Sequence, residues 1–271
     1  MSFRKIAILG GGNLGSSIAK GILDAGLVDA ANISITRRRT HLLKDLQDKG
    51  VQVTSENDQA AKGADLVILA VKPHQVSGLI EQVAPVLEQD KPIIVSVITG
   101  LTSAQLGEAL PGLEIVRAMP NTAIALRESM TCISSNGKSI DAEQKVKELF
   151  DQLGEAIIIN EELMGAATVI GACGVAFALR FMRAMSQGGI EIGFGADISQ
   201  LITAQTIKGA TRLILESSNH PEKEIDRVTT PMGVTISGLN EMEHQGFSSA
   251  VIKGLLTSFN KLELVKTNKK N

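Results

Sequence analysis

Near its start the chain reads Ile6-Ala7-Ile8-Leu9-Gly10-Gly11-Gly12-Asn13-Leu14-Gly15, and this stretch decides the fold of its first half. The four apolar residues have the length and composition of a buried parallel strand. Apolar residues then recur at helical spacing from Ser16 to Ala25, and Gly26 is placed to end that helix. The glycines form a G-x-G-x-x-G motif inside a strand, turn and helix, which predicts dinucleotide binding.

Each glycine of the motif has its own predicted role. Gly10 permits the tight turn, Gly12 lets a pyrophosphate approach the backbone, and Gly15 lets the helix pack closely on the strand. The pyrophosphate would then accept hydrogen bonds from free N–H groups at the positive end of the helix dipole. A plain glycine-rich turn is the alternative, and the attached strand and helix argue against it.

The composition is that of a globular protein. The 271 residues are 44% hydrophobic and 21% charged, which suits one large domain or two ordinary ones. A net charge of −2 and the absence of Trp and Tyr argue against a nucleic-acid partner. No apolar run is expected to reach the roughly 18 residues of a membrane span, so no membrane contact is predicted. The first five residues run straight into the first strand, without room for a signal peptide, and we expect a cytoplasmic protein.

The cysteines and histidines give no sign of a metal site. Cys132 and Cys173 lie far apart in no metal-ligand spacing, which predicts reduced thiols. The four histidines are scattered along the chain. Neither a zinc site nor a Cys–His nucleophile is therefore expected.

A run of arginines follows the second predicted strand, Ile33-Ser34-Ile35-Thr36. An NAD-specific protein usually places Asp or Glu near the end of this strand to bind the ribose 2′-hydroxyl. Here the sequence has Thr36 and then Arg37-Arg38-Arg39, whose guanidinium groups can bind a 2′-phosphate. This pattern favours NADPH over NADH, and a solvated basic turn is the alternative.

Strands and helices alternate through roughly residues 1–160. Further strands are predicted at 51–54, 64–71, 93–98, 115–120, 131–134 and 156–159, with helices at 74–87, 103–110 and 142–153. Asn57 is expected in a loop. Short connections between these elements predict an α/β domain with a parallel, doubly wound sheet of the Rossmann type.

The character of the sequence changes from Glu161 to the end, where no strand-like run occurs. Residues 166–192 are apolar over most of a helical circumference, so this helix must be buried. Helices at 198–215 and 248–264 also have apolar faces. So much apolar surface in residues 161–271 predicts an all-helical domain that is buried against a second copy of the chain.

Two stretches have the composition of a binding site. Residues 117–122 lie past the end of a predicted strand, where doubly wound folds place their ligand crevice. Residues 226–236 form a Thr-rich turn that opens a helix, and its hydroxyl and free N–H groups suit a carboxylate. An ordinary capped helix start is the alternative.

These stretches give the chain a resemblance to the pyrroline-5-carboxylate reductase family. The residues that carry it are the glycine motif at Gly10, Ala70-Val71-Lys72-Pro73, Met119-Pro120-Asn121-Thr122, Ala204-Gln205-Thr206 with Gly209-Ala210, Val228 to Leu239, and Glu243-His244-Gln245-Gly246-Phe247. The segment from Val228 to Leu239 is close to the family signature. The resemblance spans nearly the whole chain and keeps every segment in order.

The resemblance implies an NAD(P)-binding domain over residues 1–160 and a helical substrate-binding and dimerisation domain over residues 161–271. It implies a homodimer, which in this family often assembles into a decamer. It further implies the reduction of 1-pyrroline-5-carboxylate to L-proline. Together with the glycine motif and the arginine run, the resemblance predicts a set of cofactor-binding residues. They are Gly10, Gly12, Asn13, Leu14, Gly15, Arg37, Arg38, Asn57, Val71, Lys72, Pro73, Thr99 and Asn121. The substrate set is Asn121, Thr230, Met232, Gly233 and Thr235, with the Thr235 hydroxyl facing the ring nitrogen as the catalytic group.

The chain departs from the family pattern at several positions. Met232 stands where the family usually has Gly, and Ala123 where it has Pro. Cys173 and Val175 belong to a stretch, Gly171–Phe177, that lacks the usual Ser, Pro and Tyr. A reductase of a related cyclic imine and a non-catalytic NADP-binding relative therefore stay open. A β-hydroxyacid dehydrogenase would need a Lys in the long helix at 166–192, which has none.

Overall fold

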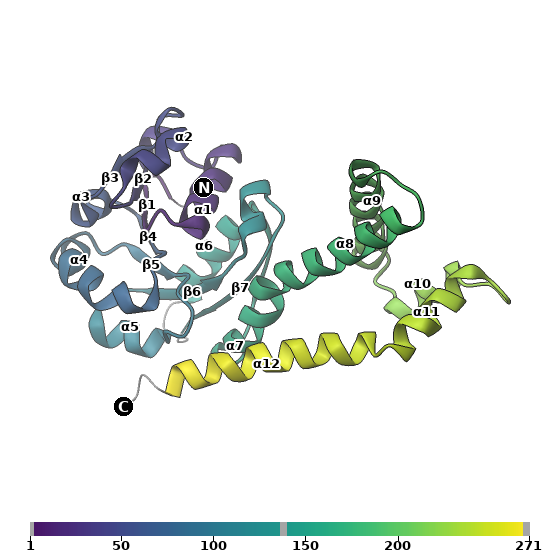
Figure 1. Ribbon diagram of the computed structural model, residues 1–271. Helices are drawn as coiled ribbons and strands as arrows, with labels where there is room; N and C mark the ends of the chain where they lie inside the picture. Colours follow the sequence, from purple (N-terminus) through teal and green to yellow (C-terminus); the bar gives the residue numbers. More distant parts are fainter. Residues whose placement is uncertain (1–2, 136–139, 268–271) are drawn as a thin grey trace. The chain divides into compact units, whose positions relative to one another are not determined.

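The computed structural model describes residues 3–135 and 140–267 (Figure 1). The chain forms two compact units. Of the described residues, those up to Cys173 and those from Lys261 to Thr267 form the first unit, and Gly174–Asn260 form the second. The domain boundary expected between residues 160 and 161 stays a prediction. By packing, residues 161–173 belong to the first unit.

An eight-stranded sheet is the centre of the first unit, with the order β3-β2-β1-β4-β5-β6-β7-β8 (Figure 1). The strands are β1 (Ile6–Leu9), β2 (Ile33–Thr36), β3 (Gln52–Thr54), β4 (Leu66–Leu69), β5 (Ile93–Ser96), β6 (Ile115–Met119), β7 (Ser129–Ser135) and β8 (Gly154–Ile158). Strands β1 to β6 are parallel and have the strand order of a dinucleotide-binding fold. The predicted Rossmann-type fold is confirmed.

The expectation of an entirely parallel sheet is wrong for the last two strands. β7 pairs with β6 in the antiparallel direction, with Met119 opposite Cys132, and β8 is parallel to β7. The chain passes from β6 to β7 through one short 3-10 helix, η4 (Thr122–Leu126). A parallel crossover needs a dozen or more residues, so this connection can only reverse the chain.

Helices cover both faces of the sheet. They are α1 (Asn13–Asp24), α2 (Lys44–Gln47), α3 (Asn57–Ala61), α4 (Val76–Asp90), α5 (Ser103–Ala109) and α6 (Ile140–Asp151). Ile6 and Ile8 of β1 join a core with α1 and α6, whereas Ala7 and Leu9 join one with α3, α4 and α5. Because both faces are covered, the strands are apolar without alternation.

The ends of two helices bear on the predictions. Gly26 has φ +62 and donates its N–H to the carbonyl of Leu23, while Leu27 donates to Ile22. These two bonds form a Schellman motif, which confirms Gly26 as the stop of α1. Asn57, expected in a loop, is instead the first residue of α3.

The predicted long helix at 166–192 is divided in the structure. It consists of η5 (Glu161–Leu163), α7 (Met164–Ala167), a π-helix at Thr168–Cys173 and α8 (Gly174–Glu191). Among the described residues, Glu161–Glu191 is the one helical segment long and apolar enough to cross a membrane by length and composition, with a mean hydropathy of 1.7. The expectation that no run is that long is therefore wrong.

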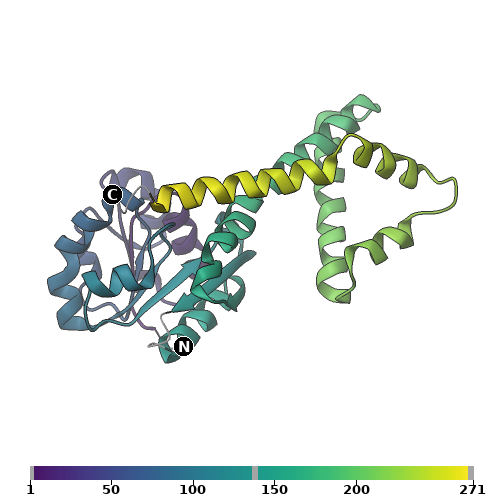
Figure 2. The same cartoon turned by 90° about the horizontal axis from the view of Figure 1, so that it is seen from below.

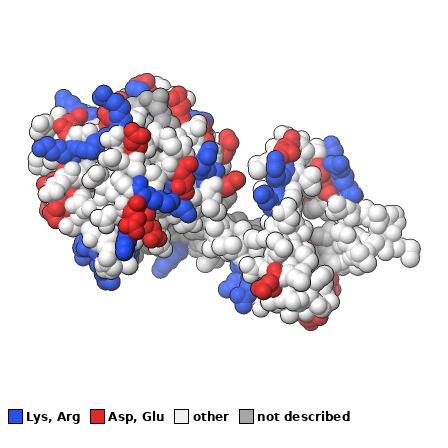
Figure 3. All heavy atoms as spheres, turned by 90° about the horizontal axis from the view of Figure 1, so that it is seen from above, with Lys and Arg blue, Asp and Glu red and all other residues white. Residues whose placement is uncertain are grey.

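The second unit is all-helical, as predicted. It contains α8, α9 (Ala196–Ser217), α10 (Pro221–Val228), α11 (Val234–His244) and most of α12 (Phe247–Thr267) (Figure 2). Ser199 and Thr203 are the buried residues among those described in this unit, and the Ser199 hydroxyl donates to the carbonyl of Ser186 at 2.7 Å. Many of its large apolar side chains are exposed, and Figure 3 shows broad uncharged areas on its surface. These helices were expected to be buried against a second copy of the chain. In a single chain their apolar faces are uncovered.

Candidate functional site

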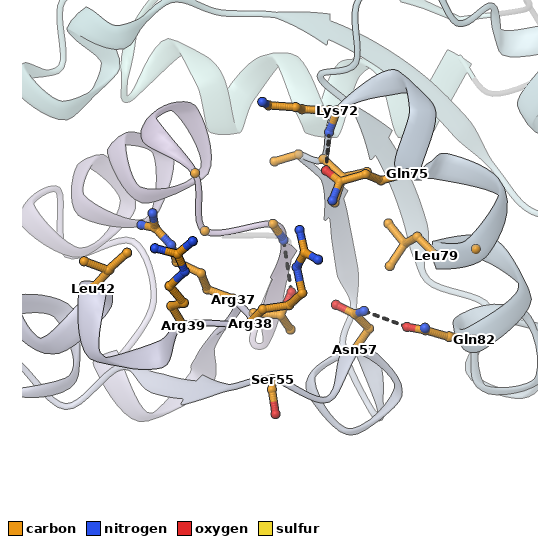
Figure 4. A pocket seen from close by; sticks show the side chains of 17 residues that line it. Arg37, Arg38, Arg39, Leu42, Ser55, Asn57, Lys72, Gln75, Leu79 and Gln82 are labelled. Carbon is orange, nitrogen blue, oxygen red and sulfur yellow. Dashed lines mark hydrogen bonds between the residues drawn. The ribbon is translucent and has the colours of Figure 1, made fainter.

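A cavity of about 730 Å³ opens over the glycine loop of the first unit (Figure 4). It brings together seven of the predicted cofactor residues from four places in the sequence. They are Gly10, Gly12, Arg37, Arg38, Asn57, Val71 and Lys72. The cavity lies at the carboxyl ends of the parallel strands, where open α/β sheets bind their ligands.

The glycine loop has the geometry that the motif requires. Gly10 has φ +117, and a Cβ there would lie 2.6 Å from the carbonyl oxygen of Ala70. A Cβ on Gly15 would collide with the carbonyl oxygen of Gly10. A Cβ on Gly12 would meet no atom within 4 Å, so the backbone at Gly12 faces open space. The loop therefore leaves room for a phosphate against its backbone.

The start of α1 offers hydrogen-bond donors beside this space. Gly12 is the N-cap residue and provides no side-chain cap. The first N–H groups of a helix have no partner within the helix, so those at Asn13, Leu14 and Gly15 are suited to an anion. These three residues lie in the first turn of α1 rather than among the residues that line the cavity.

Positive charge dominates the cavity wall. Arg37, Arg38 and Arg39 stand on one side of it, opposite Leu79 and Gln82 of α4 (Figure 4). No carboxylate lines this cavity, and the three guanidinium groups make no ion pair with a residue that the structure describes. Such a wall fits a group with several negative charges, such as a phosphorylated dinucleotide.

Thr36 supports the glycine loop instead of facing the cavity as a free hydroxyl. The Gly10 N–H donates to Thr36 Oγ1 at 3.0 Å, and the Gly11 N–H donates to the Thr36 carbonyl at 2.5 Å. Thr36 is itself buried. The position that holds an acidic residue in NAD-specific proteins is thus occupied by a side chain that fixes the loop.

The sequence reasoning missed the contribution to the cavity of α4 and of Gln75, the N-cap residue before it. Gln75, Gly78, Leu79 and Gln82 line one wall, and Gln82 Oε1 accepts a hydrogen bond of 2.8 Å from Asn57 Nδ2. Leu42 and Ser55 were missed as well. The spacing of 75, 78, 79 and 82 is that of one face of a helix, but this spacing alone does not say that the face borders a cavity.

Three more predicted cofactor residues lie outside the cavity. Pro73 begins η3 (Pro73–Gln75), and Thr99 follows β5. Asn121 follows β6 and is buried, and its side chain makes two hydrogen bonds: Nδ2 donates to the carbonyl of Gly171 at 3.0 Å, and Oδ1 accepts from the Ala123 N–H at 2.9 Å. Asn121 therefore holds the π-helix to the end of β6.

The predicted substrate residues of the second unit form a tight turn before α11. The Gly233 N–H donates to the carbonyl of Thr230 at 2.9 Å, and Met232 between them has φ +60. A Cβ on Gly233 would lie 2.5 Å from Thr230 Oγ1, so the turn needs glycine there. α11 begins without a side-chain cap, and Thr235 is exposed in its first turn.

Other chemistries find little support in the described part of the chain. No group of three His, Cys, Asp or Glu residues is placed to hold a metal ion there. Burial raises the pKa of the Cys132 thiol, which lies in a small core with Met119 and Met164. A thiol with a raised pKa is a poor nucleophile.

The fold and the cavity define an oxidoreductase of the NADP-binding class. Residues 5–100 match the family described as NADP oxidoreductase coenzyme F420-dependent, and residues 161–264 match the family described as pyrroline-5-carboxylate reductase dimerisation. The helical half is thus a self-association domain, which accounts for its apolar exterior.

Whole-chain relatives identify the family. The chain is 45% identical over 275 residues to pyrroline-5-carboxylate reductase 2 of Dictyostelium discoideum, covering 95% of this chain and 92% of that protein. The crystal structure of a Plasmodium falciparum pyrroline carboxylate reductase with NADP bound matches with a TM-score of 0.88 at 25% identity, over 98% of this chain and 99% of the other. A Coxiella burnetii pyrroline-5-carboxylate reductase matches with a TM-score of 0.84 at 29% identity, over 96% and 97%. This chain belongs to the pyrroline-5-carboxylate reductase family, which confirms the resemblance.

Proposed function

We propose that this chain reduces 1-pyrroline-5-carboxylate to L-proline, with NADPH as the preferred reductant. The observation that carries the proposal is the arginine-lined cavity over the glycine loop in a chain of this family. NADPH supplies the hydride when it is bound. The residues of the chain bind and orient the two reactants, and orientation of this kind can supply about 7–11 kcal/mol of the barrier.

The substrate itself needs little acid–base assistance. A cyclic imine is basic enough to arrive protonated, so its C5 carbon is already electrophilic. The chain then has to hold the imine and to stabilise the amine that forms. A histidine or carboxylate is not required for this, and we assign the hydrogen bond at the ring nitrogen to the Thr235 hydroxyl.

The turn before α11 is our candidate for the substrate carboxylate. Thr230, Met232 and Gly233 form the turn at the N-terminus of this helix. The Gly233 N–H is used within the turn, and the free N–H groups of the first turn of α11, together with the helix dipole, stabilise an anion there. The Thr235 hydroxyl makes no hydrogen bond with any residue in the described ranges, so it is available to a ligand. We further propose that Asn121 contributes to the site by its place at the end of β6.

A steady-state assay with 1-pyrroline-5-carboxylate and NADPH tests the activity, and Thr235→Ala tests the assignment. Loss of one hydrogen bond to a charged group costs about 1.5–3 kcal/mol, so kcat and kcat/KM should fall together by roughly ten- to a hundredfold. Thr235→Ser keeps the hydroxyl and should recover most of the rate. Unchanged kinetics in the alanine variant would remove Thr235 from the mechanism.

Two outcomes of the same assay favour the alternatives. A wild-type protein that oxidises NADPH with other cyclic imines but not with this one would be a reductase of a related substrate. A protein that binds NADPH and reduces none of them would be a non-catalytic relative. Met232, Cys173, Val175 and Ala123 are the positions to exchange for the family residues in either case.

The preference for NADPH rests on the arginines beside the cavity. We propose that Arg37 and Arg38 bind the 2′-phosphate, and their replacement by Ala should raise the KM for NADPH while leaving that for NADH nearly unchanged. Arg4→Ala removes an exposed guanidinium that does not line the cavity and is the control. Equal effects of the double substitution on both cofactors would contradict the assignment.

For the assembly, we propose a homodimer as the minimal unit and a decamer as the larger assembly that such dimers form. We also propose a cytoplasmic location. The exposed apolar side chains of α8 and α9 support the dimer. Light scattering that gave a stable, active monomer of 28.7 kDa would contradict it.

A further inference from the structure

Glu161 lies at the centre of a cluster that the proposed mechanism does not use. Its Oε1 accepts hydrogen bonds from the Ser103 N–H at 2.7 Å and from Arg117 Nη1 at 3.0 Å. Its Oε2 accepts from the Ser103 hydroxyl. One carboxylate thereby joins residues that are 44 and 58 positions away in the sequence.

The cluster is a partly buried ion pair. Arg117 is 5% exposed and Ser103 is fully buried, whereas the Glu161 side chain is 26% exposed. Burial alone would raise the pKa of Glu161, but the bonds from Ser103 and Arg117 outweigh it and hold that pKa below its usual range. Glu161 is therefore charged at neutral pH and is the counter-charge of Arg117. Removing one partner of a buried pair leaves the other charge uncompensated.

Unpartnered polar atoms lie next to this pair. Arg117 Nε and Ser134 Oγ are the buried side-chain atoms without a hydrogen-bond partner in the described ranges. Arg117 of β6 stands directly opposite Ser134 of β7 in the sheet. Glu161 is the carboxylate that pairs with the Arg117 guanidinium, at 3.0 Å.

The three residues belong to three segments that the chain brings together around β6. Ser103 begins α5, directly after the loop at 99–102 that follows β5. Arg117 is the middle residue of β6. Glu161 opens η5, at the residue where the match to the dimerisation family starts.

The loop at 99–102 lies where the second half of a dinucleotide is expected. The arginines after β2 mark the place of the phosphorylated half, and a doubly wound fold binds the other half across the switch point between β1 and β4. That half would lie over the carboxyl ends of β4, β5 and β6. The Glu161 carboxylate bonds the first N–H of α5 and so fixes the end of the β5 loop there.

We propose that Glu161 is a positioning residue for hydride transfer, which rests on the proposed function. By bonding Ser103 and Arg117, its carboxylate fixes the end of the loop at 99–102 and the middle of β6 against the start of the helical segment. The phosphorylated half of the cofactor binds elsewhere, in the arginine-lined cavity. Loss of Glu161 should therefore impair turnover much more than cofactor binding.

The test compares Glu161→Ala and Glu161→Gln with Glu162→Ala in the full-length protein. Glu162 is an exposed carboxylate next in the chain and has no hydrogen bond or ion pair within the described residues, so it is a matched control. Three quantities are measured: kcat at saturating substrates, the Kd for NADPH, and the folded fraction by circular dichroism.

Misplacement of a reacting group by 1 Å can cost about a hundredfold in rate, so Glu161→Ala should lower kcat at least about tenfold, per folded molecule. The Kd for NADPH should stay within about twofold, because the arginine cavity is intact. Glu162→Ala should match the wild type in all three quantities. Glu161→Gln keeps the hydrogen-bonding shape without the charge and should fold. Its kcat should lie between those of Glu161→Ala and Glu162→Ala.

Each other result overturns the inference. If Glu161→Gln, or a folded Glu161→Ala protein, has the wild-type kcat, Glu161 is merely structural. The same holds if the loss of kcat only follows the loss of folded protein, or if the Kd for NADPH rises as much as kcat falls. A wild-type protein that fails to reduce 1-pyrroline-5-carboxylate would refute the proposed function instead, so the two failures are distinguishable.

Discussion

The two units of this chain differ in how far their large apolar side chains are buried. In the first unit, two cores lie on the two faces of one sheet, and residues such as Ile8 and Phe150 have no exposed surface. In the second unit, large apolar residues such as Leu201 and Ile192 are 70% and 79% exposed. Apolar patterning therefore predicts that a face will be buried, but it does not say which chain covers it.

A core substitution in the first unit should have the largest effect on stability. Phe150→Ala removes a fully buried ring from between α6 and the sheet, and such changes cost about 3–5 kcal/mol. Because the first unit covers its own core, this loss should not depend on protein concentration. Denaturant unfolding at two concentrations measures it.

Leu126→Ala is the control for this change, since Leu126 is 73% exposed in the same unit and should lose almost nothing. A cost for Phe150→Ala that fell steeply at high protein concentration would show that the first unit, too, depends on self-association.

A charge on the exposed apolar face of the second unit should have the next largest effect. Leu201 lies on α9, and Leu201→Asp would place an unpaired carboxylate in the proposed interface between two copies. We expect self-association to weaken at least about a hundredfold, equivalent to about 2.7 kcal/mol, as measured by sedimentation equilibrium.

Leu126→Asp gives the matched comparison, because Leu126 is about equally exposed but belongs to the first unit. It should leave the association unchanged. If both variants dissociate alike, or neither does, the exposed face of α9 is not the interface.

Most of the first unit could be predicted from the sequence because its signals are local. β1, β4 and β5 are apolar runs, and Gly26 ends α1 as its position predicts. The reversal at β7 depends on the length of the link after β6, which the pattern of the strand itself does not contain. The π-helix at 168–173 is bonded by the Asn121 side chain, which lies 50 residues from Gly171 in the sequence, so no local pattern contains this contact.

The candidate site could be predicted only in part, for the same reason. The glycine loop and Arg37 and Arg38 are adjacent in sequence to the strands that place them. The wall formed by Gln75 and Gln82 was missed, because helical spacing alone does not say which face of α4 borders a cavity. Nor does any local signal bring Glu161 to Ser103, since that contact exists only in the folded sheet.

The smallest expected effect is on the free energy of unfolding, and it comes from replacing one residue with a positive φ in each unit by glycine. Lys91 after α4 and Met232 before α11 both have a positive φ, 47° and 60°. A left-handed conformation costs a side-chain-bearing residue about 1–2 kcal/mol, and the greater freedom of glycine in the unfolded chain offsets about 0.5–1 kcal/mol of this. Lys91→Gly should therefore raise the free energy of unfolding by about 0.5–1 kcal/mol.

Met232→Gly should relieve the same backbone strain, yet we expect a smaller gain from it. The Met232 side chain is fully exposed in the single chain, next to Val234, which is 91% exposed. If a second copy covers the apolar surface of this unit, the glycine variant loses packing contacts that Lys91 never makes. Denaturant unfolding at a concentration where the protein is associated should then rank Lys91→Gly above Met232→Gly. Equal gains would mean that the Met232 side chain stays in water after assembly, and the turn before α11 would have to be excluded from the interface.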